Sequence, residues 1–326
     1  MPRRCRYAGI RLTDTLSGAK DLIMYELSFT DDPSRFLTEA ADHLAAQPVL
    51  NTVLMTNAER AVRERAAGVQ PEPGRPHWYV IIRRQPDDDH GPDAADGIVG
   101  VAMRTAPKAP HPLWVQEMPE DAAVELARTL HARGELIGGA SGALPAARTV
   151  AEEAARLSSR TPRISSHTRL FELEELIWPP SPPGSLRPAC EDDLELLNHW
   201  LTIFQTEAAE QGSRTASRQP EHDRDDTRRR IREGRLWVWE DDGEVVHMTG
   251  GGPPSLDVAR IAPVFTPKQH RGRGYAAATV AGVSQHFRDA GVRVCLFTDQ
   301  ANPVSNKVYQ RIGYRPVVDT VEYLIE

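Results

Sequence analysis

Hydrophobic and polar positions repeat with two different periods along this chain of 326 residues. Apolar residues three to four positions apart are typical of a helix with one buried face, and alternating or continuous apolar runs are typical of strands. In the first half, this pattern predicts helices over 36–47, 119–134 and 144–157. Strands are predicted over 77–84, 97–105 and 167–176.

The second half repeats this order of elements. Helices are predicted over 191–208, 225–235, 275–291 and 302–314, and strands over 258–267, 292–299 and 315–325. A hairpin is predicted over 236–250, because Asp242-Gly243 is a favoured two-residue turn. Each half therefore runs helix, hairpin, strand, helix, strand, helix, strand, which indicates a duplicated α/β (α+β) architecture.

Proline separates the two halves. The stretch WPPSPPGSLRP at 178–188 cannot continue a helix or a central strand, because its prolines lack the backbone N–H. We interpret 179–187 as a linker between a domain at 21–178 and a second domain at 188–326. Residues 1–20 are basic but lack the apolar stretch of a signal peptide, and we expect a poorly structured leader there.

Composition narrows the class of protein. The net charge of -7 argues against a general nucleic-acid binder, which needs a basic face. Three scattered cysteines, Cys5, Cys190 and Cys295, indicate neither a disulfide framework nor a zinc site, and they favour a reducing cytoplasm. The chain also lacks a run of about 18 apolar residues, so no membrane span is expected.

The most informative stretch is QHRGRGYA at 269–276, between a predicted strand and a predicted helix. Glycine lets a ligand approach the backbone, and unpaired amides at a helix start bind anions such as a pyrophosphate. The stretch is not a Walker A loop, because Tyr275 and Ala276 stand where Lys and Ser or Thr are needed, and Ala277 breaks the dinucleotide-binding pattern. The competing interpretation is a tight turn with solvated arginines.

Two motifs that follow one another along the chain resemble those of the GNAT superfamily of acyl-CoA N-acyltransferases. Gln269 to Gly274 fits its [QR]-x-x-G-x-[GA] signature, and NPVSNKVYQRIGY at 302–314 is similar to its second motif. The resemblance covers about 187–326. The first half matches only in element order and lacks the signature, so we interpret it as a degenerate GNAT-like domain that does not bind CoA. The resemblance implies two such domains, each with a mixed, mostly antiparallel sheet flanked by helices.

The resemblance also implies a donor site for acetyl-CoA as co-substrate. The backbone of Val264–Thr266 would pair with the pantetheine arm, and the amides of Arg271–Ala276 would hold the pyrophosphate. Tyr309 would be the general acid; the alternative is a buried core tyrosine. The full set of expected donor contacts is Val264, Phe265, Thr266, Gln269, His270, Arg271, Gly272, Arg273, Gly274, Tyr275, Ala276, Asn302, Ser305, Asn306 and Tyr309. Asn302 is equally well explained as a turn or cap residue.

The amine that accepts the acyl group must lose a proton to a base. The sequence offers no obvious candidate for that base. Many family members keep a glutamate on the strand before the glycine loop, where this sequence has Arg260, Ile261 and Pro263. His247 and Glu207 are the catalytic alternatives, each weighed against a merely structural or solvated role. Trp200, Phe204 and Glu207 share one helix face and would line the acceptor pocket, although core packing also explains the two aromatics.

These features predict an N-acyltransferase that moves an acetyl group from acetyl-CoA to a primary amine of a small molecule by direct attack in a ternary complex. Two alternatives remain open. One is a module that binds acyl-CoA without turnover, and the other is a transferase whose donor is a longer acyl-CoA or an aminoacyl-tRNA, to which only the arginines within 228–235 point. No metal, membrane or nucleic-acid partner is expected, and the protein is a monomer or homodimer.

Overall fold

A computed structural model describes residues 25–69, 74–85, 97–106, 109–211 and 223–326, with side chains left out at 208–211. The expected leader at 1–20 lies outside this range. The first half contains β1 (Tyr25–Thr30), α1 (Pro33–Glu39), α2 (Ala41–Ala46), α3 (Thr52–Ala66), β2 (Trp78–Arg84), β3 (Ile98–Arg104), β4 (Leu113–Val115), α4 (Glu120–Ala132), β5 (Gly139–Ala143), α5 (Ala146–Leu157) and β6 (Pro162–Leu173).

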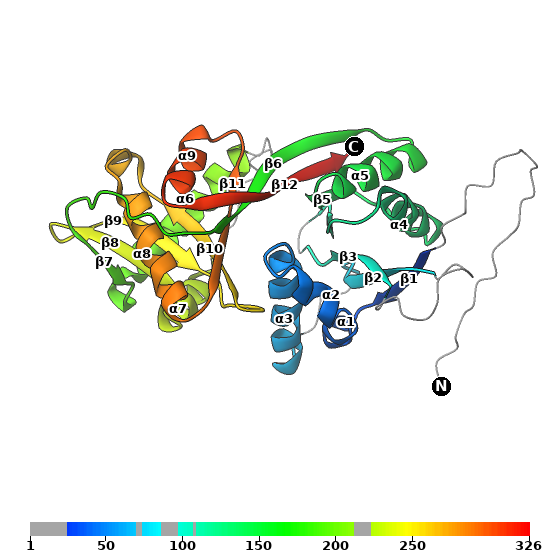
Figure 1. Cartoon of the computed structure of the whole chain (residues 1–326), viewed down its shortest axis with the longest axis horizontal. Coiled ribbons are helices and arrows are strands. Elements are labelled where there is room, and N and C mark those ends of the chain that lie inside the picture. Colours follow the sequence, from blue (N-terminus) through cyan, green and yellow to red (C-terminus); the bar gives the residue numbers. More distant parts are fainter. Residues whose placement is uncertain (1–24, 70–73, 86–96, 107–108, 212–222) are drawn as a thin grey trace, which may run out of the picture.

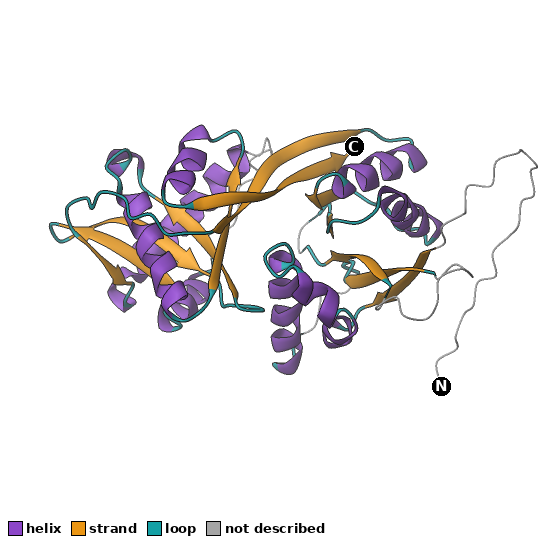
Figure 2. Ribbon diagram, in the orientation of Figure 1, coloured by secondary structure: helices purple, strands orange, loops and turns teal. Residues whose placement is uncertain are grey.

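The second half follows the same plan (Figure 1). It contains β7 (Ser185–Pro188), η1 (Glu191–Asp193), α6 (Leu194–Gln211), α7 (Arg224–Arg232), β8 (Leu236–Asp241), β9 (Glu244–Gly251), β10 (Val258–Phe265), η2 (Lys268–His270), α8 (Tyr275–Asp289), β11 (Arg293–Asp299), α9 (Pro303–Arg311) and β12 (Tyr314–Ile325). Helices lie on both sides of the strands, as Figure 2 shows. The two halves do share one order of elements, as expected, but the sequence pattern did not locate β1, α3, β4 or β5 in the first half.

Local chemistry explains several boundaries. The hairpin β8–β9 turns at Asp242 and Gly243, whose φ angles of 49° and 77° are those of the favoured two-residue turn. The helix expected over 36–47 is instead two helices, α1 and α2. The Thr38 hydroxyl donates to the Ser34 carbonyl near the break, a contact that often bends helices. Strand β7 occupies the end of the proline-rich stretch and is an edge strand, the position where proline is tolerated.

The two halves share one sheet by exchanging strands. The strand order is β1-β2-β3-β4-β5-β12-β6-β11-β10-β9-β8-β7. Strand β6 comes from the first half but pairs with β11 of the second, from Thr168–Asp299 to Glu172–Cys295. Strand β12 comes from the second half but pairs with β5 of the first. The long ribbon of β6 and β12 therefore links both halves, as Figure 1 shows.

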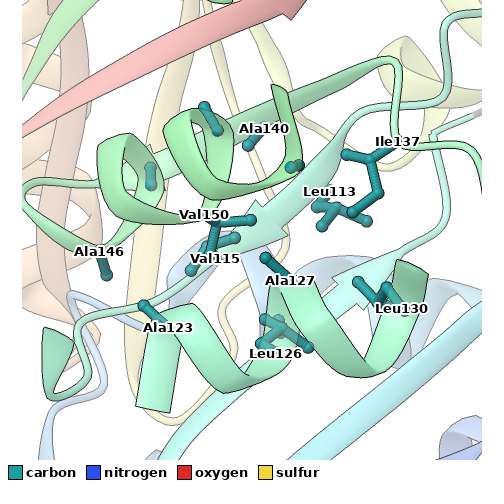
Figure 3. Close-up of a cluster of buried hydrophobic side chains, with 14 of the residues drawn as sticks. Leu113, Val115, Ala123, Leu126, Ala127, Leu130, Ile137, Ala140, Ala146 and Val150 are labelled. Atoms are coloured by element: carbon teal, nitrogen blue, oxygen red, sulfur yellow. The ribbon is translucent and has the colours of Figure 1, made fainter. Parts of the chain in front are cut away.

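The exchanged strands contribute to the cores of both halves. The first core lies between the sheet and α4 and α5, and Figure 3 shows part of it, including Leu113, Leu126 and Val150. Val321 and Tyr323 of β12 belong to this core, whereas Phe171 and Leu173 of β6 belong to the core beneath α8 and α9. Each large apolar side chain buried in this way stabilises the fold by about 1.5–3 kcal/mol. No helix within the described ranges is long and apolar enough to cross a membrane.

Candidate functional site

The site begins where two parallel strands of the second half part. β10 pairs with β11 only from Val258–Arg293 to Arg260–Cys295. Beyond this point β10 pairs with β9 and β11 pairs with β6, so the facing edges of the two strands separate. An extended ligand arm can hydrogen-bond to a strand edge that has lost its neighbour.

The equivalent place in the first half is closed. β4 pairs with β5 through all three of its residues, Leu113–Val115. Gly142 of β5 packs so tightly there that an added Cβ would lie 1.9 Å from the Val115 carbonyl oxygen. Along its described residues β4 therefore offers no separated strand edge beside β5.

The glycine loop follows the separated end of β10. Gly272 and Gly274 have φ angles of 80° and 90°, a backbone region that favours glycine, and Gly274 is the N-cap of α8. An added Cβ at Gly272 would meet no protein atom within 4 Å. Within the described ranges, the amides of Gly272, Arg273 and Gly274 donate no backbone hydrogen bond, and the first-turn amides of a helix also lack intrahelical acceptors. The loop therefore exposes free amides of the kind that bind anions at helix N-termini.

Side chains hold this loop in place. Arg271 donates from Nε to the Thr266 carbonyl at 2.8 Å and from its terminal nitrogen to Glu207 of α6, also at 2.8 Å. The Tyr275 hydroxyl donates to Asp241, and this bond raises the pKa of Tyr275. His270 is buried with Nε2 at 3.2 Å from Glu244. The loop is thus tethered to α6 and to the β8–β9 hairpin.

These contacts favour a different alignment of the signature on the sequence. The pattern [QR]-x-x-G-x-[GA] also fits Arg271, Gly274 and Ala276, a register that the sequence analysis missed. In this register the first side chain fastens the loop to β10, and the glycine caps α8. Gln269, the first residue in the earlier register, is exposed in η2. The predicted helix start was the signal that would have found the second register.

The expected acceptor residues on α6 have protein partners. Glu207 is ion-paired with Arg271, as described above. Trp200 is 6% exposed and its ring lies 5.7 Å from that of Phe265, in the core between α6 and the sheet. Phe204 packs against the same core but stays partly exposed. Core packing therefore explains Trp200 and Phe265, and Phe204 is the aromatic of this helix with surface left for a ligand.

Asparagines shape the start of α9. Asn302 is the N-cap of this helix, and its Oδ1 accepts from the Ser305 amide at 3.1 Å. Asn306 donates from Nδ2 to the carbonyls of Asp299 and Asn302, whereas its Oδ1 is buried without a partner in the described chain. A buried acceptor without a donor is costly and is often completed by a ligand. Ser305 is partly exposed beside it.

Tyr309 lies one turn further along α9. Its ring is 7% exposed and makes an edge contact with Tyr314 at 6.1 Å. Burial raises the pKa of Tyr309 to about 12, so the phenol is protonated at physiological pH. The hydroxyl has no hydrogen-bond partner among the described residues, unlike that of Tyr314, which bonds Ser284 at 2.7 Å. The ring is thus a core side chain whose hydroxyl is free to donate.

His247 is enclosed in the sheet. It is 0% exposed, and its Nδ1 and Nε2 lie 2.7 and 2.8 Å from the hydroxyls of Thr266 and Thr249. Burial lowers the pKa of His247 to about 3, so the ring is neutral at physiological pH. A general base needs a free lone pair within reach of its substrate. These contacts weigh against the catalytic role expected from the sequence.

The buried His247 makes stability depend on pH. In the unfolded chain its pKa is about 6.5, so below that value the unfolded state binds a proton that the folded state excludes. The free energy of unfolding should therefore fall as pH drops from 6.5 towards about 3, by up to ~1.4 kcal/mol per pH unit. We expect His247→Gln to flatten this slope in urea titrations between pH 4 and 6. The same change at the exposed His199 should leave the slope intact.

Metal-binding groups of side chains are a further kind of candidate site. In the part of the chain that the structure describes, no three His, Cys, Asp or Glu residues are grouped for metal binding. The acidic loop at 87–96, and 221–222 of the stretch EHDRDD, lie outside the described ranges.

Comparisons with known proteins found a family and several solved structures that this chain resembles. Residues 195–314 match the family described as Acetyltransferase (GNAT) family. A GCN5-related N-acetyltransferase from Sphaerobacter thermophilus has a TM-score of 0.53 at 15% identity, covering 92% of this chain and 94% of that one. A Drosophila protein solved by structural genomics has a TM-score of 0.55 at 13% identity, covering 93% and 98%. No curated protein matches the sequence. The two likenesses extend over both halves and confirm the expected fold class.

Proposed function

Because residues 195–314 match the GNAT acetyltransferase family, we propose that the protein transfers an acetyl group from acetyl-CoA to a primary amine of a small molecule. One observation carries the proposal. The separated strands β10 and β11 end beside a loop of free amides at the start of α8. A diphosphate suits that loop, and an arm that carries amide groups suits the strand edge beside it.

Residues of this chain fit the donor along its length. The amides of Gly272–Ala276 would hold the diphosphate, with Arg273 adding positive charge. The edge of Val264–Thr266 would pair with the pantetheine arm. The unpaired Oδ1 of Asn306 would accept from an N–H of that arm, which would satisfy a buried group that the protein leaves open.

The chemistry follows from this placement. The amine lone pair attacks the thioester carbonyl, and a backbone N–H on the free edge of β10 stabilises the oxyanion. The carbon–sulfur bond then breaks, and Tyr309 gives its phenolic proton to the leaving thiolate. The amine loses its proton to water or to a base other than His247 and Glu207. Holding both substrates in one complex supplies much of the acceleration.

The rival functions differ in what they require. A donor-binding module without turnover would use the same loop, and turnover assays separate it from the transferase. An aminoacyl-tRNA donor would need free cations on α7. Arg228 instead pairs with Glu191 at 2.6 Å, and Arg230 pairs with Asp226 at 2.7 Å. Because these arginines are already paired with carboxylates, they offer little free positive charge to a tRNA. The aminoacyl-tRNA alternative is therefore not favoured.

Calorimetric titration with acetyl-CoA tests the donor site. We expect micromolar binding to the wild type and a loss of at least about 100-fold in Gly274→Glu, because the carboxylate would stand where the diphosphate binds. Gly291→Glu is the matched control. Gly291 also has a positive φ, of 75°, with no atom near an added Cβ, but it lies beyond the opposite end of α8. Equal binding by all three proteins, or by none, would contradict the proposal.

A further inference from the structure

Arg260 occupies the point where β10 and β11 part. It is the last residue of β10 that pairs with β11, opposite Cys295. Its neighbours Ala259 and Ile261 belong to the core beneath α8 and α9, which also contains Tyr309. Because side chains alternate along a strand, Arg260 faces the opposite side of the sheet. The proposed donor residues on α8 and α9 therefore lie on one face, and Arg260 lies on the other.

That other face is where the first half packs against the second. Val258 and Cys295 of the sheet cluster there with Val49, which precedes α3. The rings of Trp114 from the first half and Phe297 from β11 make an edge contact at 6.4 Å. An amine that reaches the separated strands from the side opposite the donor would approach at this junction between the halves.

No described residue is a partner of Arg260 at this junction. Among the described residues, no acceptor or carboxylate bonds its guanidinium, which is only partly exposed. Burial lowers the pKa of Arg260, and the charge of Arg60 on α3 acts in the same direction. Glu172 of β6 pairs with Arg293 at 2.7 Å, and Glu59 of α3 accepts from Ser255 at 2.7 Å, so these two carboxylates have other partners.

An unpaired, partly buried cation is costly, and a ligand anion is the group that would offset this cost. We propose, building on the transferase function above, that Arg260 binds an anionic group of the acceptor, which is therefore an amine that also carries a carboxylate or a phosphate. The planar guanidinium forms paired hydrogen bonds with either group. A positive charge at this place would favour amines that also carry a negative charge over simple amines.

Matched acceptor pairs test this assignment. CoA release is followed with β-alanine against β-alaninamide, and with phosphoethanolamine against ethanolamine, so that the two arms distinguish a carboxylate from a phosphate. We expect the anionic member of one pair to be preferred at least about tenfold in kcat/KM. Arg260→Gln should abolish this preference, mainly through KM, and Arg260→Lys should restore part of it. If neither anionic member is preferred, or if Arg260→Gln keeps the preference, the inference is wrong.

Thermal unfolding gives a second readout that needs no substrate. Arg260→Met keeps an unbranched apolar chain in place of the arginine stem and removes the unpaired charge, so we expect Tm without ligand to rise by roughly 2 °C or more. A lower Tm would mean that groups of the protein itself bind the guanidinium, and this result would contradict the inference. Acetyl-CoA titration separates the two claims, because loss of donor binding contradicts the proposed function, whereas a donor-binding enzyme indifferent to acceptor charge contradicts only the role of Arg260.

Discussion

Replacing Tyr309 with phenylalanine is expected to lower kcat for acetyl transfer by about 10²- to 10⁴-fold while leaving the Kd for acetyl-CoA nearly unchanged. The hydroxyl is the group removed, and it has no hydrogen-bond partner among the described residues, so the fold loses little. The departing thiolate would lose its proton donor. Single-turnover kinetics with a saturating amine, together with calorimetric titration of the donor, measure the two quantities separately.

The pH profile sharpens this expectation. Because the pKa of Tyr309 is raised to about 12, the acid stays protonated over the usual assay range, and kcat should not decline on the alkaline side before about pH 10. Tyr314→Phe is the matched control, since its hydroxyl is bonded to Ser284 and its loss should cost stability rather than kcat. A Tyr309→Phe enzyme with wild-type kcat would remove this residue from the proposed chemistry.

Cutting the chain between its halves is expected to leave two fragments that stay together. A protease site inserted after Ser181 would separate the sequences of the halves but not the strand pairs of β6 with β11 and of β12 with β5. The nicked protein should elute as one species on size exclusion. It should come apart only in denaturant, because each fragment supplies a strand to the core of the other.

The same exchange predicts the fate of one fragment alone. A chain of residues 182–326 lacks β6, so the core beneath α8 and α9 loses Phe171 and Leu173, and β11 becomes an exposed edge. Deleting one buried phenylalanine side chain already costs about 3–5 kcal/mol, a large part of the 5–15 kcal/mol that stabilises a typical domain. We expect this fragment to be unfolded or aggregated by circular dichroism and light scattering. A soluble, folded fragment that binds acetyl-CoA would contradict the structural role of the exchange.

Local signals explain how much of the site could be predicted. The glycine loop and the motif at 302–314 each fall within a short stretch, and their spacing alone places them at the starts of two helices. The hairpin at Asp242-Gly243 was predictable for the same reason, since a turn depends on its own residues. β5, in contrast, has the composition GASGA, which favours no strand, and it is a strand because β4 and β12 pair with it on either side.

The sequence by itself determined most of the elements of the second half, the family resemblance of that half and the two motifs for which we propose a donor site. Only the tertiary structure decided that β6 and β12 change places, that Glu207 pairs with Arg271 and that His247 is buried between two threonine hydroxyls. It also decided that Arg260 faces the other half without a partner among the described residues. Periodicity and turn chemistry act over a few residues and can be read along the chain. Strand partners and the neutralisation of buried charge depend on residues far apart in sequence, so they exist only once the chain has folded.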